Sequence, residues 1–277
     1  MTSIYQALAA IEETNALAAL CTIVRSQGAT PRHTSSKMLV YADGSILGSV
    51  GGGELENRVR AEAMRAMQEG CPRLLTYQMA DTQRGDVGNC GGEVEVFVEP
   101  IQPKPVLLVI GSGHVGKAVV HLGRWLGFHV VVSDDRGELC NPNATPEAHE
   151  YHVVPMNELP SNFTITPWTY IVLTTRGVDV DVKGLPAILE SPAAYIGVIG
   201  SRRRWITTRK QLIEAGVSAE LLNRVHSPIG LELNAETPEE IAVSILAEVI
   251  MLRYHGDGRM MSQNHPQVET KLNNVRP

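Results

Sequence analysis

The sequence predicts an α/β protein in which an N-terminal α+β domain is followed by a doubly wound domain built on a parallel sheet. After residue 106, short stretches rich in valine and isoleucine alternate with helical patterns, which is typical of a parallel sheet covered on both faces. Before residue 100, a helical pattern at Ile4 to Glu13 and an amphipathic one at Leu55 to Gln68 accompany a hairpin signal at Asp43-Gly44. The two halves therefore differ in fold.

A glycine motif carries the strongest signal in the second half. Gly111, Gly113 and Gly116 follow an apolar strand at 106–110 and precede a helical pattern and a second strand at 129–133. In nucleotide-binding βαβ units the first glycine permits a tight turn, the second admits a phosphate, and the third packs helix on strand. The free N–H groups at the helix N-terminus suit an anion. The motif predicts a Rossmann-like nucleotide-binding domain, and the alternative is the same fold with a crevice that is empty or binds something else.

Further residues around this motif are expected to complete the site. Asp134 follows Gly116 by 18 positions, near the spacing of about 20 residues at which a carboxylate binds a ribose hydroxyl. His114 stands inside the glycine motif, and Arg136 follows the acidic pair that ends the second strand. We therefore expect Asp134, His114 and Arg136 to form part of the cofactor-binding site.

Composition narrows the class of protein. The chain has 277 residues, of which 43% are hydrophobic and 19% charged, as in ordinary globular proteins. A net charge of −6 argues against nucleic acid as a partner. The N-terminus lacks the basic and apolar regions of a signal peptide, and the longest apolar helical stretch, 241–252, is too short to span a membrane. The four cysteines form no CxxC pair, which suits a reducing, cytoplasmic location without structural zinc: Cys21, Cys71, Cys90 and Cys140.

A proline-rich segment divides the chain. Residues 100–105 contain three prolines, which predicts a stiff, extended linker. We therefore expect an N-terminal domain at 1–99 and a nucleotide-type domain at 106–255. The polar tail at 256–277 is expected to be mobile or to contact a partner.

Two glycine-containing loops of the N-terminal half could bind a ligand. The segment 28–32 combines glycine, proline and Arg32 before a run of hydroxyl residues, so it is either an anion cradle or a hydrogen-bonded surface turn. Gly51, Gly52 and Gly53 open the second predicted helix. Consecutive glycines are entropically unfavourable and indicate a close approach by the backbone, either to a ligand or to a packed neighbouring segment.

A third loop holds a cysteine. Cys90 is followed by Gly91 and Gly92 just before a predicted strand. An accessible thiol beside backbone N–H groups can have a lowered pKa and act as a nucleophile or metal ligand. The alternative is a small buried side chain, which is the commoner role of a free cysteine.

Loops after the later strands also carry candidate residues. Arg176 follows one predicted strand, and Ser201 and Arg202 follow the next, so both groups belong to the carboxyl edge of the sheet where α/β folds bind ligands. Three arginines at 202–204 oppose the dipole of the helix that they open, which favours an anionic partner over a merely solvated first turn. His226, in a small-residue turn, is expected to be structural.

Together these loops resemble the XdhC/CoxI family of xanthine dehydrogenase accessory proteins. Thr30 departs from the serine that is usual in this family, and 34–37 depart from its usual glycine-alanine-lysine run, which affects only the shape of the first loop. The segments that carry the resemblance span both halves: 28–32, 46–54, 90–92, 111–116, 134–136, 197–204 and 226–240.

The resemblance implies a maturation factor for a molybdenum hydroxylase such as xanthine dehydrogenase. Such a protein binds molybdenum cofactor, as molybdopterin or its dinucleotide form, protects its sulfurated state, and hands it to the apo-enzyme in cooperation with a cysteine desulfurase. Cys90 would contact the sulfur or the molybdenum, and a homodimer is expected.

Other functions use the same residues. No general acid–base pair stands out in the sequence, which favours a carrier over a turnover catalyst. The main alternative is an NAD(P)-dependent oxidoreductase that uses the glycine motif, and a docking scaffold with a vestigial crevice is the third possibility.

Overall fold

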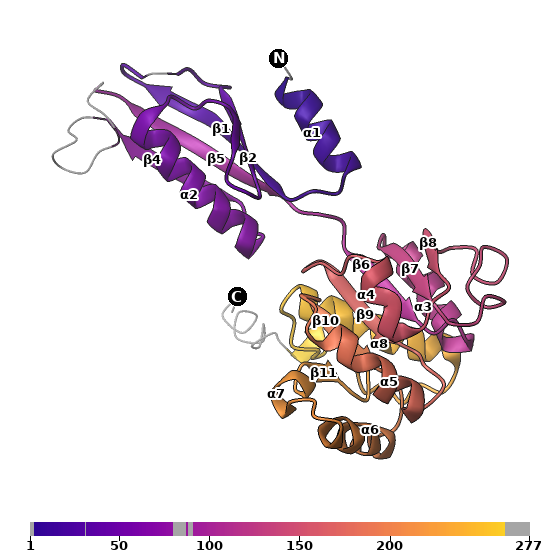
Figure 1. The fold of residues 1–277 in the computed structure, drawn as a ribbon. Helices are drawn as coiled ribbons and strands as arrows, with labels where there is room; N and C mark the ends of the chain where they lie inside the picture. Colours follow the sequence, from indigo (N-terminus) through magenta and orange to yellow (C-terminus); the bar gives the residue numbers. More distant parts are fainter. Residues whose placement is uncertain (1–2, 31, 80–86, 88–90, 264–277) are drawn as a thin grey trace, which may run out of the picture. The chain divides into compact units, whose positions relative to one another are not determined.

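The computed structural model describes residues 3–30, 32–79, 87 and 91–263 of the chain. The chain forms two compact units, Met1–Lys104 and Pro105–Pro277 (Figure 1). We refer to them as the N-terminal unit and the C-terminal unit. Each has its own hydrophobic core, so each is described by itself.

The N-terminal unit is built on an antiparallel sheet with the strand order β3-β2-β1-β5-β4. The predicted hairpin at Asp43-Gly44 is confirmed, since it joins two antiparallel strands that pair Val40 with Ile46. The strands are β1 (Ala18–Gln27), β2 (Lys37–Tyr41), β3 (Ile46–Gly48), β4 (Arg73–Gln78) and β5 (Glu93–Ile101).

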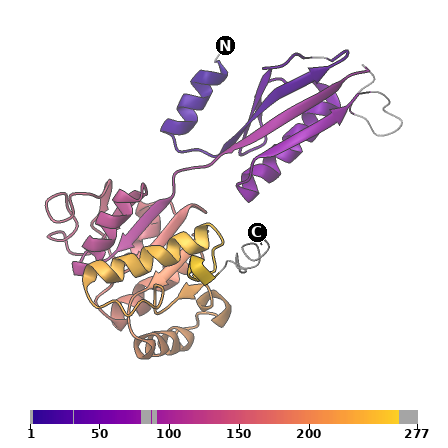
Figure 2. The same cartoon turned by 180° about the vertical axis from the view of Figure 1, so that it is seen from behind.

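Two helices cover opposite faces of this sheet. α2 (Gly53–Glu69) buries a stripe at every fourth residue, as its pattern predicted, against β1 side chains such as Cys21 and Ile23 (Figures 1 and 2). Burial raises the pKa of the Cys21 thiol to about 12, so this cysteine is an inert core residue. α1 (Ile4–Glu13) packs instead on Ala18, whose side chain points to the other face.

β5 extends further than the proline pattern predicted. Pro100 and Ile101 pair with Ala19 and Ala18 of β1. The other neighbour, β4, ends its pairing at Val98, so beyond that residue β5 has a free edge. A proline lacks an N–H donor and is tolerated in a strand where no partner requires one, which explains why the sheet continues through Pro100.

The C-terminal unit confirms the predicted doubly wound parallel sheet. Its strand order is β11-β10-β9-β6-β7-β8, and every neighbouring pair is parallel. The order therefore reverses between β6 and β9, at the kind of crevice where open α/β sheets bind ligands. The strands are β6 (Val106–Ile110), β7 (His129–Ser133), β8 (Glu150–His152), β9 (Thr169–Leu173), β10 (Tyr195–Val198) and β11 (Val225–His226).

Helices cover both faces of the parallel sheet. α3 (His114–Trp125) and α8 (Pro238–Arg253) pack over Leu107 and Val109 on one face (Figure 2). The other face, which carries Leu108 and Ile110, faces the remaining helices (Figure 1). Those are η2 (Met156–Glu158), α4 (Leu159–Asn162), α5 (Val178–Leu189), α6 (Arg202–Glu214) and α7 (Ala219–Leu222).

One further helical turn follows α8. This turn, η3 (Met261–Gln263), lies within the predicted tail. Across the described residues, no helix combines the length and apolarity that crossing a membrane requires.

Candidate functional site

The three glycines of the turn after β6 have different surroundings. A side chain at Gly111, whose φ is 100°, would place its Cβ 2.7 Å from the Thr174 carbonyl oxygen. A Cβ at Gly116 would overlap the carbonyl oxygen of Gly111. Gly113, by contrast, has no heavy atom within 4 Å of such a Cβ, and it is the N-cap of α3 without a side-chain capping bond. The space in front of this helix N-terminus is therefore open, and the exposed His114 begins the helix beside it.

Asp134 holds this turn in place. Its buried carboxylate accepts hydrogen bonds from the Ser112 N–H at 2.8 Å and from the Arg136 guanidinium at 2.9 Å on each oxygen. Both oxygens are therefore engaged inside the protein. The neighbouring Asp135 is the exposed carboxylate of the pair, and nothing in the sequence distinguishes it beyond its adjacency to Asp134.

Acid should release the Asp134 bonds. Burial alone would raise the pKa of Asp134, but the bonds from Arg136 and Ser112 outweigh burial and lower it to about 2, from 3.8. A lowered native pKa stabilises the fold above the unfolded value, and that contribution disappears as the pH falls through the native value. We expect about 2 kcal/mol of unfolding free energy to be lost between pH 4 and 2 in the wild type. Asp134→Asn should remove this step in urea unfolding at graded pH, and an unchanged step would contradict the assignment.

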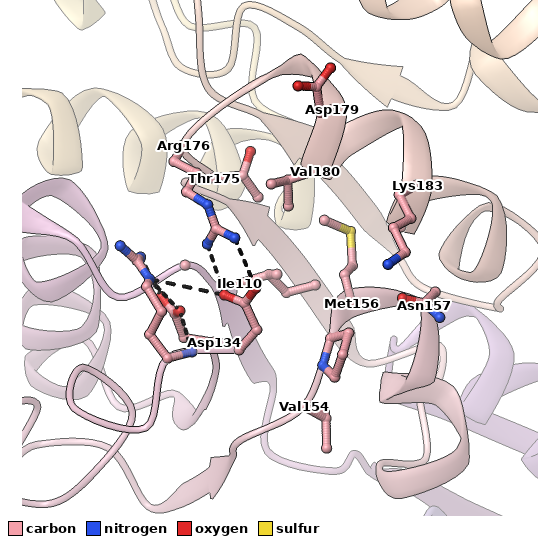
Figure 3. Close-up of a pocket in the computed structure, with 15 residues that line it drawn as sticks. Ile110, Asp134, Val154, Met156, Asn157, Thr175, Arg176, Asp179, Val180 and Lys183 are labelled. Carbon is pink, nitrogen blue, oxygen red and sulfur yellow. Dashed lines mark hydrogen bonds and ion pairs between the residues drawn. The ribbon is translucent and has the colours of Figure 1, made fainter.

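A cavity of about 260 Å³ opens at the carboxyl ends of β6, β7 and β9 (Figure 3). Gly111 lines it, so the cavity reaches the first residue of the glycine turn. Its apolar wall consists of Ile110, Val154, Pro155, Met156 and Val180, and its charged residues are Asp134, Asp135, Arg136, Arg176, Asp179 and Lys183.

An ion pair crosses the cavity entrance. Arg176, after β9, donates to both carboxylate oxygens of Asp135, after β7, at 2.8 and 2.9 Å (Figure 3). The guanidinium holds the pKa of Asp135 below its ordinary value. Both side chains are substantially exposed, at 49% and 39%, and such pairs are weak in water. An incoming anion can therefore replace Asp135 as the partner of Arg176 at little cost.

The three arginines that open α6 do not act together. Ser201 caps the helix and accepts a bond from the Arg204 N–H at 3.2 Å. Arg202 is exposed and lines a second cavity, of about 360 Å³, with residues of the 228–235 loop and α8. Arg204 turns inward instead, to a carboxylate in α5. The expected anion-binding corner thus retains Arg202 but not Arg204.

The candidate loops of the N-terminal unit gather at one end of its sheet. β1 ends and β5 begins there, with Gln27 opposite Glu93. β3 runs toward the same end of the sheet but stops at Gly48, opposite Met38, which pairs with Cys21 of β1. A Cβ at Gly28 would lie 3.1 Å from the Gly92 Cα, so these two loops are packed together. The exposed Arg32 lies in the first of them.

The glycine run before α2 is explained by its backbone conformation. Gly51, Gly52 and Gly53 have φ values of 141°, 79° and 60°, a region that residues with side chains rarely adopt. No heavy atom lies within 4 Å of a Cβ built at Gly52 or Gly53. Close packing against a neighbour therefore does not account for these two glycines, and the space above them is open.

Glu56 is a residue of this loop that sequence reasoning missed. Its carboxylate accepts bonds from the Gly52 N–H at 2.8 Å and from the Ser49 hydroxyl. An acidic residue in the first turn of a helix is common enough to carry no functional signal. Glu56 occupies part of the donor set at the α2 N-terminus, so an anion bound there would compete with it.

Cys90 lies outside the described residues, and only its neighbours can be placed. Gly91 has a φ of 77°, and its N–H donates to the Met79 carbonyl at 2.6 Å. This donor, which the sequence pattern offers for stabilising a thiolate, is therefore already engaged. Within the described ranges, no three histidine, cysteine or acidic side chains are grouped so as to bind a metal ion.

The fold and the glycine turn define a Rossmann-type protein with an additional α+β unit. A family described as "XdhC Rossmann domain" matches residues 107–249, and one described as "XdhC and CoxI family" matches residues 12–78. The chain belongs to the XdhC and CoxI family.

Several curated proteins are similar to this chain. The uncharacterized protein YqeB of Escherichia coli K12 is 38% identical over 95% of this chain and 49% of its own length. A probable xanthine dehydrogenase component of Bacillus subtilis 168 is 31% identical over 57% of this chain and 46% of its own. The molybdenum cofactor insertion chaperone PaoD of E. coli K12 is 24% identical over 86% of this chain and 84% of its own length. The matches to YqeB and the B. subtilis protein span about half the length of each.

A solved structure described as a xanthine dehydrogenase from Bacillus halodurans is also similar. It has a TM-score of 0.49 and 23% identity, and the match covers 96% of this chain and 98% of that one.

Proposed function

We propose that this protein binds molybdenum cofactor and delivers its sulfurated form to a molybdenum hydroxylase of the xanthine dehydrogenase type. The observation that supports it most is the open space in front of Gly113, at a helix N-terminus two residues after Gly111, which lines the 260 Å³ cavity. The similarity of this chain to a protein named as a molybdenum cofactor insertion chaperone supports the same function.

The residues present fit the chemistry of such a ligand. Molybdenum cofactor is a pterin that carries a phosphate or, in its dinucleotide form, a nucleotide. Backbone N–H groups at the α3 N-terminus would hold the phosphate, because a side chain is absent at Gly113 where the phosphate must approach. Arg176 and Arg136 would neutralise its charge, and the apolar wall of the cavity would cover a flat ring.

Purification with the native ligand tests this proposal directly. We expect mass spectrometry of the protein from a molybdenum-replete host to find molybdenum cofactor at about one per chain. The cofactor form, a cysteine desulfurase as sulfur donor, a homodimeric assembly and a cytoplasmic location belong to the same proposal, and neither nucleic acid nor membrane is a proposed partner. A protein that purifies without cofactor, and does not take it up when mixed with it, would contradict the carrier function.

The NAD(P)-dependent oxidoreductase remains the alternative, since the glycine turn also suits a dinucleotide. We expect no NAD(P)H-linked turnover with simple alcohols, aldehydes or hydroxy acids, measured as absorbance change at the nicotinamide band. Substrate-dependent oxidation of NAD(P)H at rates of about 1 per second or more, within the ordinary enzyme range, would replace the carrier with the oxidoreductase.

Cys90 is the proposed contact with sulfur or molybdenum. A serine keeps the size of the side chain but removes the soft thiolate ligand. We therefore expect Cys90→Ser to fold normally and to lose about tenfold or more in cofactor retention, a level typical of the loss of one important ligand interaction. Retention and activation of a purified apo-hydroxylase are the two measurements.

Cys71→Ser is the matched control, because Cys71 is a free, exposed cysteine of the same unit. It should retain and deliver cofactor as the wild type does. If Cys90→Ser also loads and activates its client at the wild-type level, the thiol has no role, and binding depends on the glycine loops and arginines alone.

A further inference from the structure

An ion pair between a fully buried carboxylate and a partly buried guanidinium lies directly behind the cavity. Asp181 of α5 is fully buried, and one of its oxygens accepts a bond from Arg204 of α6 at 2.6 Å. Its other oxygen accepts the hydroxyl proton of Thr175, a residue of the cavity wall. Arg204 also donates to the Thr175 carbonyl oxygen at 3.2 Å and to its hydroxyl oxygen at 2.8 Å. Thr175 is therefore fixed through both its main chain and its side chain.

The local sequence allows Arg204 to fold back toward α5. A Cβ at Gly200, whose φ is 140°, would lie 2.7 Å from the Arg204 Cδ. The missing side chain at Gly200 leaves the path of the arginine free. The adjacent Arg203 is exposed to solvent, so the inward direction is specific to Arg204.

The opposite side of the same turn rests on the glycine motif. The Thr174 hydroxyl donates to the Gly111 carbonyl oxygen, and the Thr174 N–H donates to the Ile110 carbonyl oxygen. The segment Thr174–Arg176 is thus held between the Gly111 turn and the Asp181–Arg204 pair. Its last residue, Arg176, reaches across the cavity entrance to Asp135.

Stability alone does not explain such a pair. Removing two charges from water is unfavourable, and well-packed apolar residues often stabilise a fold equally well. A buried pair does, however, impose one geometry on the groups that it contacts. Here the contacted group is the main chain immediately before Arg176.

We propose that Arg204 and Asp181 are positioning residues that fix the Thr174–Arg176 turn, and through it the direction of Arg176, for an anionic ligand in the cavity. The identity of that ligand as molybdenum cofactor rests on the proposed function. The positioning of the turn in the ligand-free protein does not rest on the proposed function, so the positioning role and the identity of the ligand can be tested separately.

The test compares Arg204→Met and Arg204→Lys with Arg203→Met, the exposed neighbour, in the full chain. Hydrogen–deuterium exchange of the ligand-free protein reports on the 174–177 backbone. Titration with molybdenum cofactor released from a purified molybdenum enzyme reports on affinity. We expect Arg204→Met to accelerate exchange at 174–177 and to weaken binding about tenfold, as loss of a supporting contact does elsewhere. Arg204→Lys should give an exchange rate and an affinity between those of the wild type and Arg204→Met, because one amine cannot donate to Asp181 and to the Thr175 carbonyl in the same way. Arg203→Met should change neither measurement.

An Arg176→Ala background separates positioning from general damage. If Arg204 acts through Arg176, adding Arg204→Met there should weaken binding by less than about twofold, since residues in one chain of contacts are not additive. A full tenfold loss in that background, or unchanged exchange at 174–177, would overturn the proposal. If Arg204→Met does not fold, Arg204→Lys decides by the same exchange criterion. A wild type that binds no cofactor would overturn the proposed function, and exchange in the ligand-free protein would then decide the positioning role alone.

Discussion

Gly116→Val is expected to destabilise the C-terminal unit strongly, whereas Gly113→Val should leave its stability nearly unchanged and prevent ligand binding. A Cβ at Gly116 would overlap the Gly111 carbonyl, and main chain cannot move aside as a flexible side chain can. We expect a loss of roughly 3 kcal/mol of unfolding free energy, typical of severe overpacking, and a fall in Tm of about 10 °C for a unit of this size. Calorimetry of the two variants gives the comparison.

Gly113 offers the matched variant because its backbone is ordinary. Its φ of −69° and ψ of −167° suit any residue, and no heavy atom lies near a Cβ there. Valine at this position should cost at most about 1 kcal/mol as a poor N-cap, while occupying the space proposed for the phosphate. Wild-type cofactor affinity in folded Gly113→Val would show that the ligand binds elsewhere. Equal Tm values for the two variants would show that the packing at Gly116 is loose.

A second large loss of unfolding free energy is expected when Glu248, in the middle of α8, is replaced. Its carboxylate accepts bonds from the Tyr195 hydroxyl at 2.7 Å, from the Gly230 N–H at 2.6 Å and from His226 Nδ1 at 3.0 Å. Burial acts to raise the pKa of Glu248, but these bonds outweigh it and lower the pKa below its ordinary value. Glu248→Ala leaves the buried Tyr195 hydroxyl and the Gly230 N–H without their acceptor. At about 1–3 kcal/mol for each unsatisfied group, we expect a loss of about 3 kcal/mol in urea unfolding.

Glu239→Ala is the control for Glu248→Ala, because Glu239 is exposed in the first turn of the same helix. It should change the unfolding free energy by less than about 0.5 kcal/mol. A similar small loss for Glu248→Ala would mean that water satisfies Tyr195 and Gly230 once the carboxylate is gone. The anchoring of α8 to the β10 and β11 region would then depend on apolar packing alone.

Local signals were sufficient for most of the fold. The strand, glycine turn and helix from Val106 to Trp125 are specified by neighbouring residues, and the structure has them in that order. The same holds for α8, because Thr237, Pro238 and the acids that follow form a local start signal and the helix begins there with a capping box. β8 and η2 were not predicted, because three-residue elements carry too short a pattern to separate from loop.

The directions of several site side chains depend on partners that are distant in sequence, so local signals could not predict them. By its position Arg204 is one of three cations at a helix N-terminus, yet its direction depends on Asp181, 23 residues earlier. Asp134 has the spacing of a ribose ligand, yet Ser112 and Arg136 engage both its oxygens. Asp135, one residue later, is the carboxylate at the cavity entrance. Both acids line the cavity, but only Asp135 is exposed there. Which of two adjacent acids is exposed depends on the alternation of side chains along the chain and on what packs against each one, and the local sequence does not specify those neighbours.

The open space at Gly52, Gly53 and Gly113 has a consequence for how such a site can be found by mutation. Recognition that depends on main-chain donors and on the absence of side chains leaves the intervening residues free to change. An alanine scan of charged and polar positions would pass over such a site, since it never adds a side chain to a glycine. Substitutions that enlarge these three positions are the informative ones, and if the proposed function is right, a β-carbon there should prevent the ligand from binding.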